Sequence, residues 1–183
     1  MGDKTPDFRA LDVMALCRNA ARVEGQSPLA RMPRLNSSLF EGACEPTAAW
    51  IAQGSLHPAA GGEPEVWLHL QARMAVALQC QRCLQPVTEA LIVDRRFRFV
   101  RSEAEAERLD EESDDDVLVL EPRLDLTALL EDELILGLPL VPRHLVCPMP
   151  LLPPGAVLAQ DESAPHPFAA LAALRGRPPR DDS

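Results

Sequence analysis

Residues 66–100 read VWLHLQARMAVALQCQRCLQPVTEALIVDRRFRFV, two alternating runs joined by a short cysteine turn. The first run repeats apolar side chains at every second position: Val66, Leu68, Leu70, Met74, Val76 and Leu78. The second run has Leu91, Val93, Phe97 and Phe99 on one face and Ile92, Asp94, Arg96 and Arg98 on the other. A period of two is typical of strands with one face on a core, and strands this close in sequence pair antiparallel. We therefore predict a long hairpin, in which Arg95, on the apolar face, lies near an edge or has a partner.

Weaker patterns flank this hairpin on both sides. Asp12 is a suitable N-cap for a helix over residues 13–21, and Gly25 and Pro28 follow it as breakers. The other expected elements are a weakly extended segment at 37–52, a short helix at 103–109, a short strand at 117–120 and a helix at 125–136. They predict an α+β fold with an antiparallel β-sheet, a packed helix and a short N-terminal helix. Whether the sheet curls partly into a barrel stays open.

The distribution of prolines divides the chain. Residues 1–147 are expected to form a single α+β domain. Residues 148–183 are rich in proline and largely without periodicity, which predicts a Pro-rich linker, a short helical tail and a disordered C-terminal end.

Composition excludes several classes of protein. The 183-residue chain has a formal charge of −10, which disfavours generic binding to a phosphate backbone, although a local basic patch still permits contact with RNA. No stretch approaches the ~20 apolar residues that a membrane span requires. The five cysteines are irregularly spaced and do not resemble a disulfide framework. With arginine replacing lysine almost throughout, we expect an acidic bacterial protein of the reducing cytoplasm.

The cysteine turn is the main candidate for chemistry. Cys80 and Cys83 have the Cys-x2-Cys spacing with which two thiolates hold one tetrahedral metal ion. His144 and Cys147, again separated by two intervening residues, could complete a zinc site from the C-terminal side. The alternative is that the cysteines are small packing residues at a strand end. A redox pair is less favoured, because no helix follows the turn to lower a thiol pKa.

The rest of the chain lacks a catalytic set. It contains no Gly-x-Ser-x-Gly, His-Glu-x-x-His or P-loop pattern. The acidic triplet Glu131, Asp132 and Glu133 could bind a cation, but successive helix residues point in different directions, so we interpret it as solvated helix surface. We expect no enzymatic activity, no small-molecule substrate and no cofactor beyond zinc.

Five arginines gather near the turn and the second strand: Arg82, Arg95, Arg96, Arg98 and Arg101. On the solvent face they would form a basic ridge that contacts RNA phosphates or another partner. Alternatively, they pair with the acidic residues of segment 102–116. The sequence leaves both interpretations open.

Two blocks of sequence stand out: LQCQRCLQP at residues 78–86 and LLEDELILGLPLVPRH at residues 129–144. Together they resemble the large ribosomal RNA subunit accumulation protein family (the YceD family). The residues that carry the resemblance are Cys80, Cys83, Pro86, Glu131, Asp132, Glu133, Pro139 and Pro142. Other branches of the family have a cysteine-rich stretch after the second block, where this chain has Cys147 alone.

The resemblance implies a non-enzymatic accessory factor in the synthesis, processing or stability of 23S rRNA, and thus in large ribosomal subunit biogenesis. The implied partners are rRNA, or large-subunit ribosomal proteins or precursors. Two alternatives remain: a zinc-stapled protein-interaction adaptor unrelated to ribosomes, and, with less support, a dithiol oxidoreductase.

Overall fold

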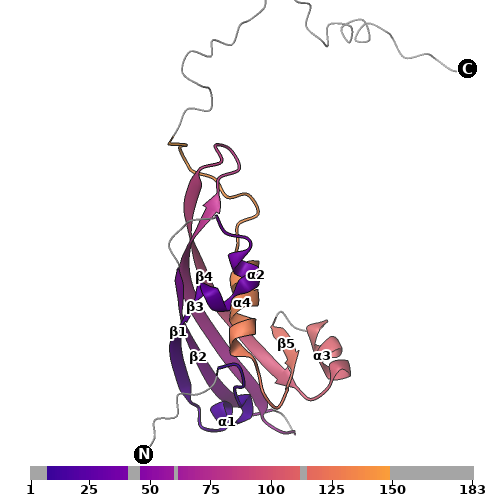
Figure 1. Ribbon diagram of the computed structural model, residues 1–183. Helices are drawn as coiled ribbons and strands as arrows, with labels where there is room; N and C mark the ends of the chain where they lie inside the picture. Colours follow the sequence, from indigo (N-terminus) through magenta and orange to yellow (C-terminus); the bar gives the residue numbers. More distant parts are fainter. Residues whose placement is uncertain (1–7, 41–45, 60–61, 112–114, 149–183) are drawn as a thin grey trace, which may run out of the picture. The chain divides into compact units, whose positions relative to one another are not determined.

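The computed structural model describes residues 8–40, 46–59, 62–111 and 115–148. The strands are β1 (Arg22–Pro28), β2 (Thr47–His57), β3 (Glu65–Gln79), β4 (Pro86–Val100) and β5 (Asp116–Val119). The helices are α1 (Val13–Arg18), α2 (Pro33–Asn36), α3 (Glu103–Asp110) and α4 (Leu126–Leu136), with a 3-10 turn at Leu29–Arg31. The five strands form one sheet in the order β1-β2-β3-β4-β5 (Figure 1). The α+β class is confirmed.

The long hairpin is the centre of the sheet, as predicted. β3 and β4 pair antiparallel over their whole length, from Val66 opposite Phe99 to Gln79 opposite Pro86. Their alternate apolar residues are buried: Val66, Leu68, Leu70, Met74, Val76 and Leu78 on β3, and Leu91, Val93, Phe97 and Phe99 on β4. Period two therefore identified both the strands and the face that lies on the core.

The sheet is mixed and open, whereas the sequence predicted an antiparallel one. β1, β2, β3 and β4 are antiparallel neighbours, but β5 pairs parallel to the end of β4, with Phe99 opposite Leu118. The reason is α3, which carries the chain back along the sheet before β5 begins, so β5 runs in the same direction as β4. β1 and β5 form the two edges, and the described sheet does not close into a barrel.

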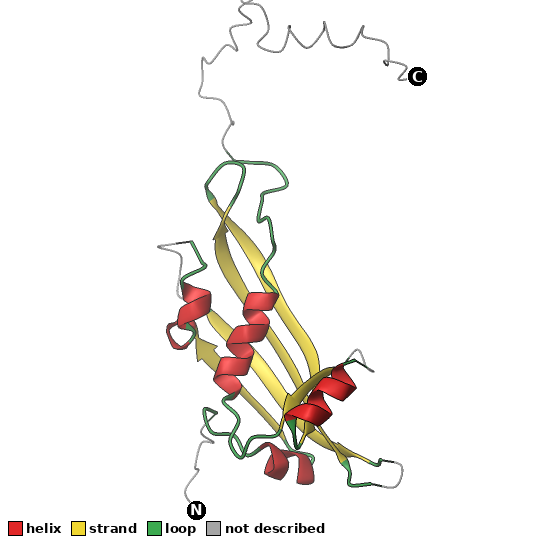
Figure 2. Cartoon of the chain, turned by 90° about the vertical axis from the view of Figure 1, so that its right-hand side faces the viewer, coloured by secondary structure: helices red, strands yellow, loops and turns green. Residues whose placement is uncertain are grey.

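Helices α1, α2 and α4 lie on one face of the sheet, as Figure 2 shows. The caps expected at Asp12 and Asp125 are present: their side chains accept hydrogen bonds from Ala15 N at 2.8 Å and Ala128 N at 3.0 Å. α1 packs directly on β2, because a Cβ at Gly54 would lie only 2.8 Å from the α1 backbone. The core therefore lies between these helices and one face of the sheet.

Gly25 and Pro28 are not breakers, which corrects the sequence interpretation. Both lie in β1, where Gly25 is opposite Trp50 of β2. The Trp50 ring lies across the strand, so that a Cβ at Gly25 would be 2.6 Å from its Cζ2 atom. Glycine is required here for a close approach of a ring to the backbone, and not for a turn.

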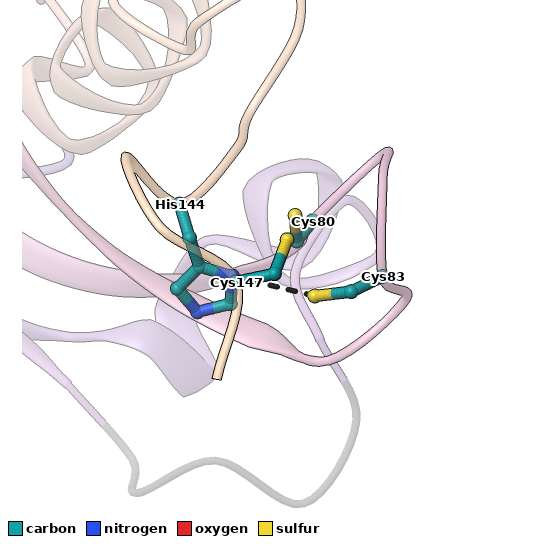
Figure 3. Close-up of side chains that lie close together, drawn as sticks. All are labelled: Cys80, Cys83, His144 and Cys147. Atoms are coloured by element: carbon teal, nitrogen blue, oxygen red, sulfur yellow. Dashed lines mark hydrogen bonds between the residues drawn. The ribbon is translucent and has the colours of Figure 1, made fainter. Parts of the chain in front are cut away.

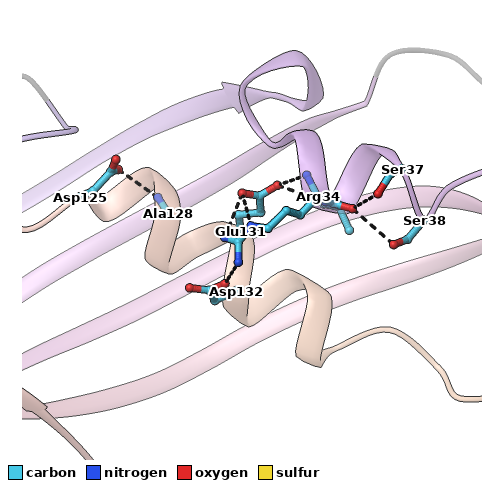
Figure 4. Close-up of polar contacts among 8 residues, drawn as sticks. Arg34, Ser37, Ser38, Asp125, Ala128, Glu131 and Asp132 are labelled. Atoms are coloured by element: carbon cyan, nitrogen blue, oxygen red, sulfur yellow. Dashed lines mark hydrogen bonds and ion pairs between the residues drawn. The ribbon is translucent and has the colours of Figure 1, made fainter.

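Two of the three acidic residues of α4 are not the solvated helix surface that the sequence suggested, whereas the Asp132 side chain is half-exposed. Glu131 is 5% exposed and Glu133 is 9% exposed. Glu131 accepts hydrogen bonds from the backbone N–H groups of Arg34 and Leu35 and pairs with the Arg34 guanidinium (Figure 4). Glu133 pairs with Arg95 at 3.3 Å. The triplet thus connects α4 to α2 on one side and to β4 on the other.

The C-terminal region remains a prediction. Residues 149–183, which contain most of the expected linker and its helical tail, lie outside the described residues. The proposed division at residues 147 and 148 therefore stays untested. Within the described part of the chain, no helix combines the length and apolar character needed to cross a membrane.

Candidate metal centre at the hairpin tip

The turn between β3 and β4 has a defined backbone conformation. Leu84 N donates to Cys80 O at 2.8 Å, and Cys80 N donates to Gln85 O at 2.9 Å. Leu84 has a φ of 61°, which is uncommon for a residue other than glycine. This tight turn brings the Cys83 thiol back towards Cys80, which is fully buried.

A second segment returns to this turn after α4. We call residues 137–148 the strap; they run from the end of α4 to the hairpin tip (Figure 2). Gln81 N donates to Pro142 O at 2.9 Å, and the His144 ring binds Pro86 O through Nε2 at 3.1 Å. Both prolines carry the family resemblance, and both supply the carbonyl of a strap-to-hairpin hydrogen bond.

All four residues predicted as metal ligands come together at this junction. The ligand atoms of Cys80, Cys83, His144 and Cys147 lie within 4.8 Å of one another (Figure 3). A tetrahedral zinc site with Zn–S bonds of about 2.3 Å has ligand–ligand distances of roughly 3.8 Å. The cluster therefore needs a contraction of only about 1 Å at its widest pair. The described residues form a Cys3His group close enough to hold a metal ion.

The orientation of His144 suits this role. Nε2 faces the Pro86 carbonyl, which can only accept, so Nε2 carries the ring proton. Nδ1 then presents its lone pair to the cluster, where it lies 3.4 Å from Cys83 Sγ. A metal-binding histidine typically donates its other ring N–H to such a carbonyl, which fixes both its tautomer and its ring plane.

The thiols of the cluster influence one another. Burial opposes the ionisation of Cys80, but hydrogen bonds from the backbone of Cys83, His144 and Arg82 outweigh it and lower the pKa of Cys80 to about 5. Burial and the neighbouring sulfurs of Cys147 and Cys80 raise the pKa of Cys83. Sulfur atoms this close oppose each other's ionisation, and a divalent cation among them would remove that conflict.

Four of the five candidate arginines pair with carboxylates. Arg95 contacts Asp116 and Glu133 from the core face of β4, so it has the partner that its position required. The remaining pairs are Arg96 with Asp115, Arg98 with Glu65 and Arg101 with Glu63. These contacts agree with the alternative of intramolecular pairing, although Glu63, Glu65 and Glu133 lie outside the acidic segment 102–116.

The candidate residues indicated by the sequence did not include Trp67, whose ring lies beside two of the five arginines. Trp67 lies on the solvent face of β3, with the guanidinium carbons of Arg96 and Arg98 at 5.8 and 6.0 Å from its ring centroid. The available signal was the alternation of β3, which places Trp67 on the same face as these two arginines once the hairpin register is known.

Sequence comparison adds an independent observation. The family model for the large ribosomal RNA subunit accumulation protein YceD matches residues 68–175. A protein of Haemophilus influenzae named large ribosomal RNA subunit accumulation protein YceD is 33% identical in an alignment 116 residues long, which covers 57% of this chain. The match spans 63% of that relative, less than two thirds of its length. No solved structure matches the chain.

Proposed function

The chain belongs to the large ribosomal RNA subunit accumulation protein family, and on this premise we propose that it supports the accumulation of 23S rRNA in the bacterial cytoplasm. The observation that carries the proposal is the family match over residues 68–175, which includes the hairpin tip and the strap. The function is that of a non-enzymatic accessory factor in the synthesis, processing or stability of this RNA.

Action by binding is supported by the position of the reactive groups. The four ligand side chains of the tip face one another, with Cys80 fully buried. A groove of about 660 Å³ on the described surface is lined by residues of β1 to β4, and none of the four ligands contributes to it. The four reactive side chains of the tip thus lie outside this groove, an arrangement that suits a structural site better than a catalytic one.

The proposed partners are rRNA or a large-subunit ribosomal protein or precursor. The charge of −10 suits a basic ribosomal protein. Arg96 and Arg98 beside Trp67 offer a mixed basic and aromatic surface on the sheet that could contact RNA. Contact with RNA there requires competition with Asp115 and Glu65, because both arginines are already paired.

A deletion strain tests the function. We expect a lower ratio of 23S to 16S rRNA in a clean deletion, and recovery when the full chain is expressed from a plasmid. A normal ratio together with a normal proportion of large subunits in sucrose gradients would contradict the proposal. Crosslinking in cells, followed by sequencing of bound RNA and mass spectrometry of bound proteins, then separates the two classes of partner.

We also propose that the Cys3His group binds one zinc ion. Three sulfurs and one imidazole nitrogen within 4.8 Å of one another are a ligand set that zinc prefers in structural sites. Protein purified without chelator should contain roughly one equivalent of zinc by elemental analysis. Less than about a tenth of an equivalent, with no uptake on titration, would overturn the metal proposal.

This site also favours a second candidate function. If the zinc is present and rRNA levels are normal in the deletion strain, the chain is better described as a zinc-stapled interaction adaptor unrelated to ribosomes. The two measurements therefore decide between the candidates independently of each other.

A further inference from the structure

We infer that Arg82 is an outer-sphere residue of the zinc site, which joins the two ligand-bearing segments and offsets the charge of the thiolates. The inference rests on the zinc binding proposed above. It assigns Arg82 a positioning role at the hairpin tip in place of a contact with RNA.

The contacts of Arg82 cross from the hairpin to the strap. Its Nε donates to Cys147 Sγ at 3.0 Å, and its second terminal nitrogen donates to the carbonyl oxygens of His144 at 3.1 Å and Leu145 at 3.4 Å. Arg82 lies between two cysteine ligands of the hairpin, and all three acceptors belong to the strap that holds the other two ligands. One guanidinium therefore spans the two halves of the site, beside the metal position rather than in it.

The chemistry of these contacts distinguishes Arg82 from the other candidate arginines. Arg95, Arg96, Arg98 and Arg101 all pair with carboxylates. Residues 79–86 and 137–148, which form the tip, contain neither Asp nor Glu. In an acidic protein this local absence of carboxylates leaves a sulfur and two carbonyls as the acceptors around Arg82.

The positive charge of Arg82 offsets the negative charge of the ligand set. A zinc ion with three thiolates and a neutral imidazole has a net charge of −1, and the adjacent guanidinium makes the assembly neutral. An N–H donor on a zinc-bound sulfur also withdraws electron density from it, which lowers its nucleophilicity. Removal of Arg82 should therefore weaken zinc binding and make Cys147 easier to alkylate.

The test uses the full chain with Arg82→Gln, Arg82→Lys and a matched control, Arg143→Gln. Arg143 lies in the same strap next to His144 and is exposed, so its replacement removes a similar charge without touching a sulfur. Zn²⁺ affinity is measured by competition with a chromophoric chelator. Loss of an outer-sphere partner typically costs 10–100-fold in metal affinity, and we expect a loss in about that range for Arg82→Gln.

Two further readouts separate this role from a general effect on folding. In the Co²⁺-loaded protein, Arg82→Gln should shift the thiolate-to-cobalt charge-transfer band, while the tetrahedral ligand-field bands persist. Alkylation of Cys147 by iodoacetamide, followed by peptide mass spectrometry, should be faster than in the wild type or in Arg143→Gln. If Arg82→Gln does not fold, Arg82→Lys decides, because one ammonium cannot reach the sulfur and both carbonyls with the geometry of a planar guanidinium.

The outcomes are distinguishable from a failure of the zinc proposal. If the wild-type protein binds no zinc, the proposed zinc site is wrong and this inference loses its basis. Wild-type protein that binds zinc, with Arg82 variants of equal affinity and equal Cys147 reactivity, overturns the role of Arg82 alone. An equal loss in Arg143→Gln also overturns it, because the effect is then general charge at the tip.

Discussion

Replacement of Glu131 by alanine should destabilise the protein far more than replacement of its neighbour Asp132. Helix α2 has no side-chain cap of its own, because Met32 precedes it. The cap comes instead from Glu131, whose Oε1 accepts from Arg34 N at 2.7 Å and from Leu35 N at 3.1 Å. The carboxylate thus satisfies two N–H groups of a helix that lies 97 residues away in sequence.

The expected magnitude follows from what each contact loses. Glu131→Ala leaves the N–H groups of Arg34 and Leu35 without their acceptor, at about 1–3 kcal/mol for the buried Leu35 donor and about 1–2 kcal/mol for the part-buried Arg34 donor. The Arg34 side chain is 54% exposed, so its guanidinium regains water and adds little to the loss. We expect about 2–5 kcal/mol in total for Glu131→Ala. Asp132 is half-exposed and, among the residues that the structure describes, pairs only with the Arg34 side chain, so Asp132→Ala should cost about 0–1 kcal/mol.

Urea denaturation of the three proteins checks the ranking, with the free energy of unfolding compared at a common slope. Glu131→Gln should fall between the two alanine variants, because its amide oxygen still accepts from the backbone but its charge is lost. A double-mutant cycle with Arg34→Ala should give a coupling smaller than the total loss, since most of the stabilisation goes to main-chain N–H groups. Equal stability of Glu131→Ala and Asp132→Ala would refute the reasoning.

Three further predictions concern other parts of the molecule. Gly25→Ala should destabilise by about 1–3 kcal/mol in urea, because its Cβ meets the Trp50 ring at 2.6 Å; an unchanged midpoint would show that the ring moves freely. Burial raises the pKa of Glu133 against the opposing charge of Arg95, so the folded state holds this proton more tightly than the unfolded chain. Stability should therefore fall as pH rises from about 4.5 through the raised pKa, and Glu133→Gln should flatten that decline in urea midpoints measured against pH. Protein freed of metal by a chelator should gain about 2.7 kcal/mol in its free energy of unfolding when free zinc reaches 100 times its dissociation constant. Cys147→Ser should abolish most of the accompanying rise in Tm. Equal rises in Tm in both proteins would count against coordination by Cys147.

The sequence by itself determined the central hairpin and the starts of two helices. The alternation in β3 and β4 identified both strands and their buried faces, since side-chain direction along a strand depends only on position. The N-caps of α1 and α4 were readable for the same reason, because Asp12 and Asp125 act within three residues of themselves. The Cys-x2-Cys and His-x2-Cys spacings indicated all four candidate ligands, as one pair from the hairpin turn and one pair from the C-terminal side.

Only the tertiary structure decided the contacts between distant segments. Glu131 and Glu133 have the composition of a solvated helix surface, and their burial depends on Arg34 and Arg95 from other elements. The parallel pairing of β5 depends on the path of α3, which no local pattern encodes. At the tip, the spacings indicated two ligand pairs about sixty residues apart, but only the return of the strap to the hairpin decided that the two pairs meet. Sequence patterns report which face a residue presents, whereas the fold determines what meets that face.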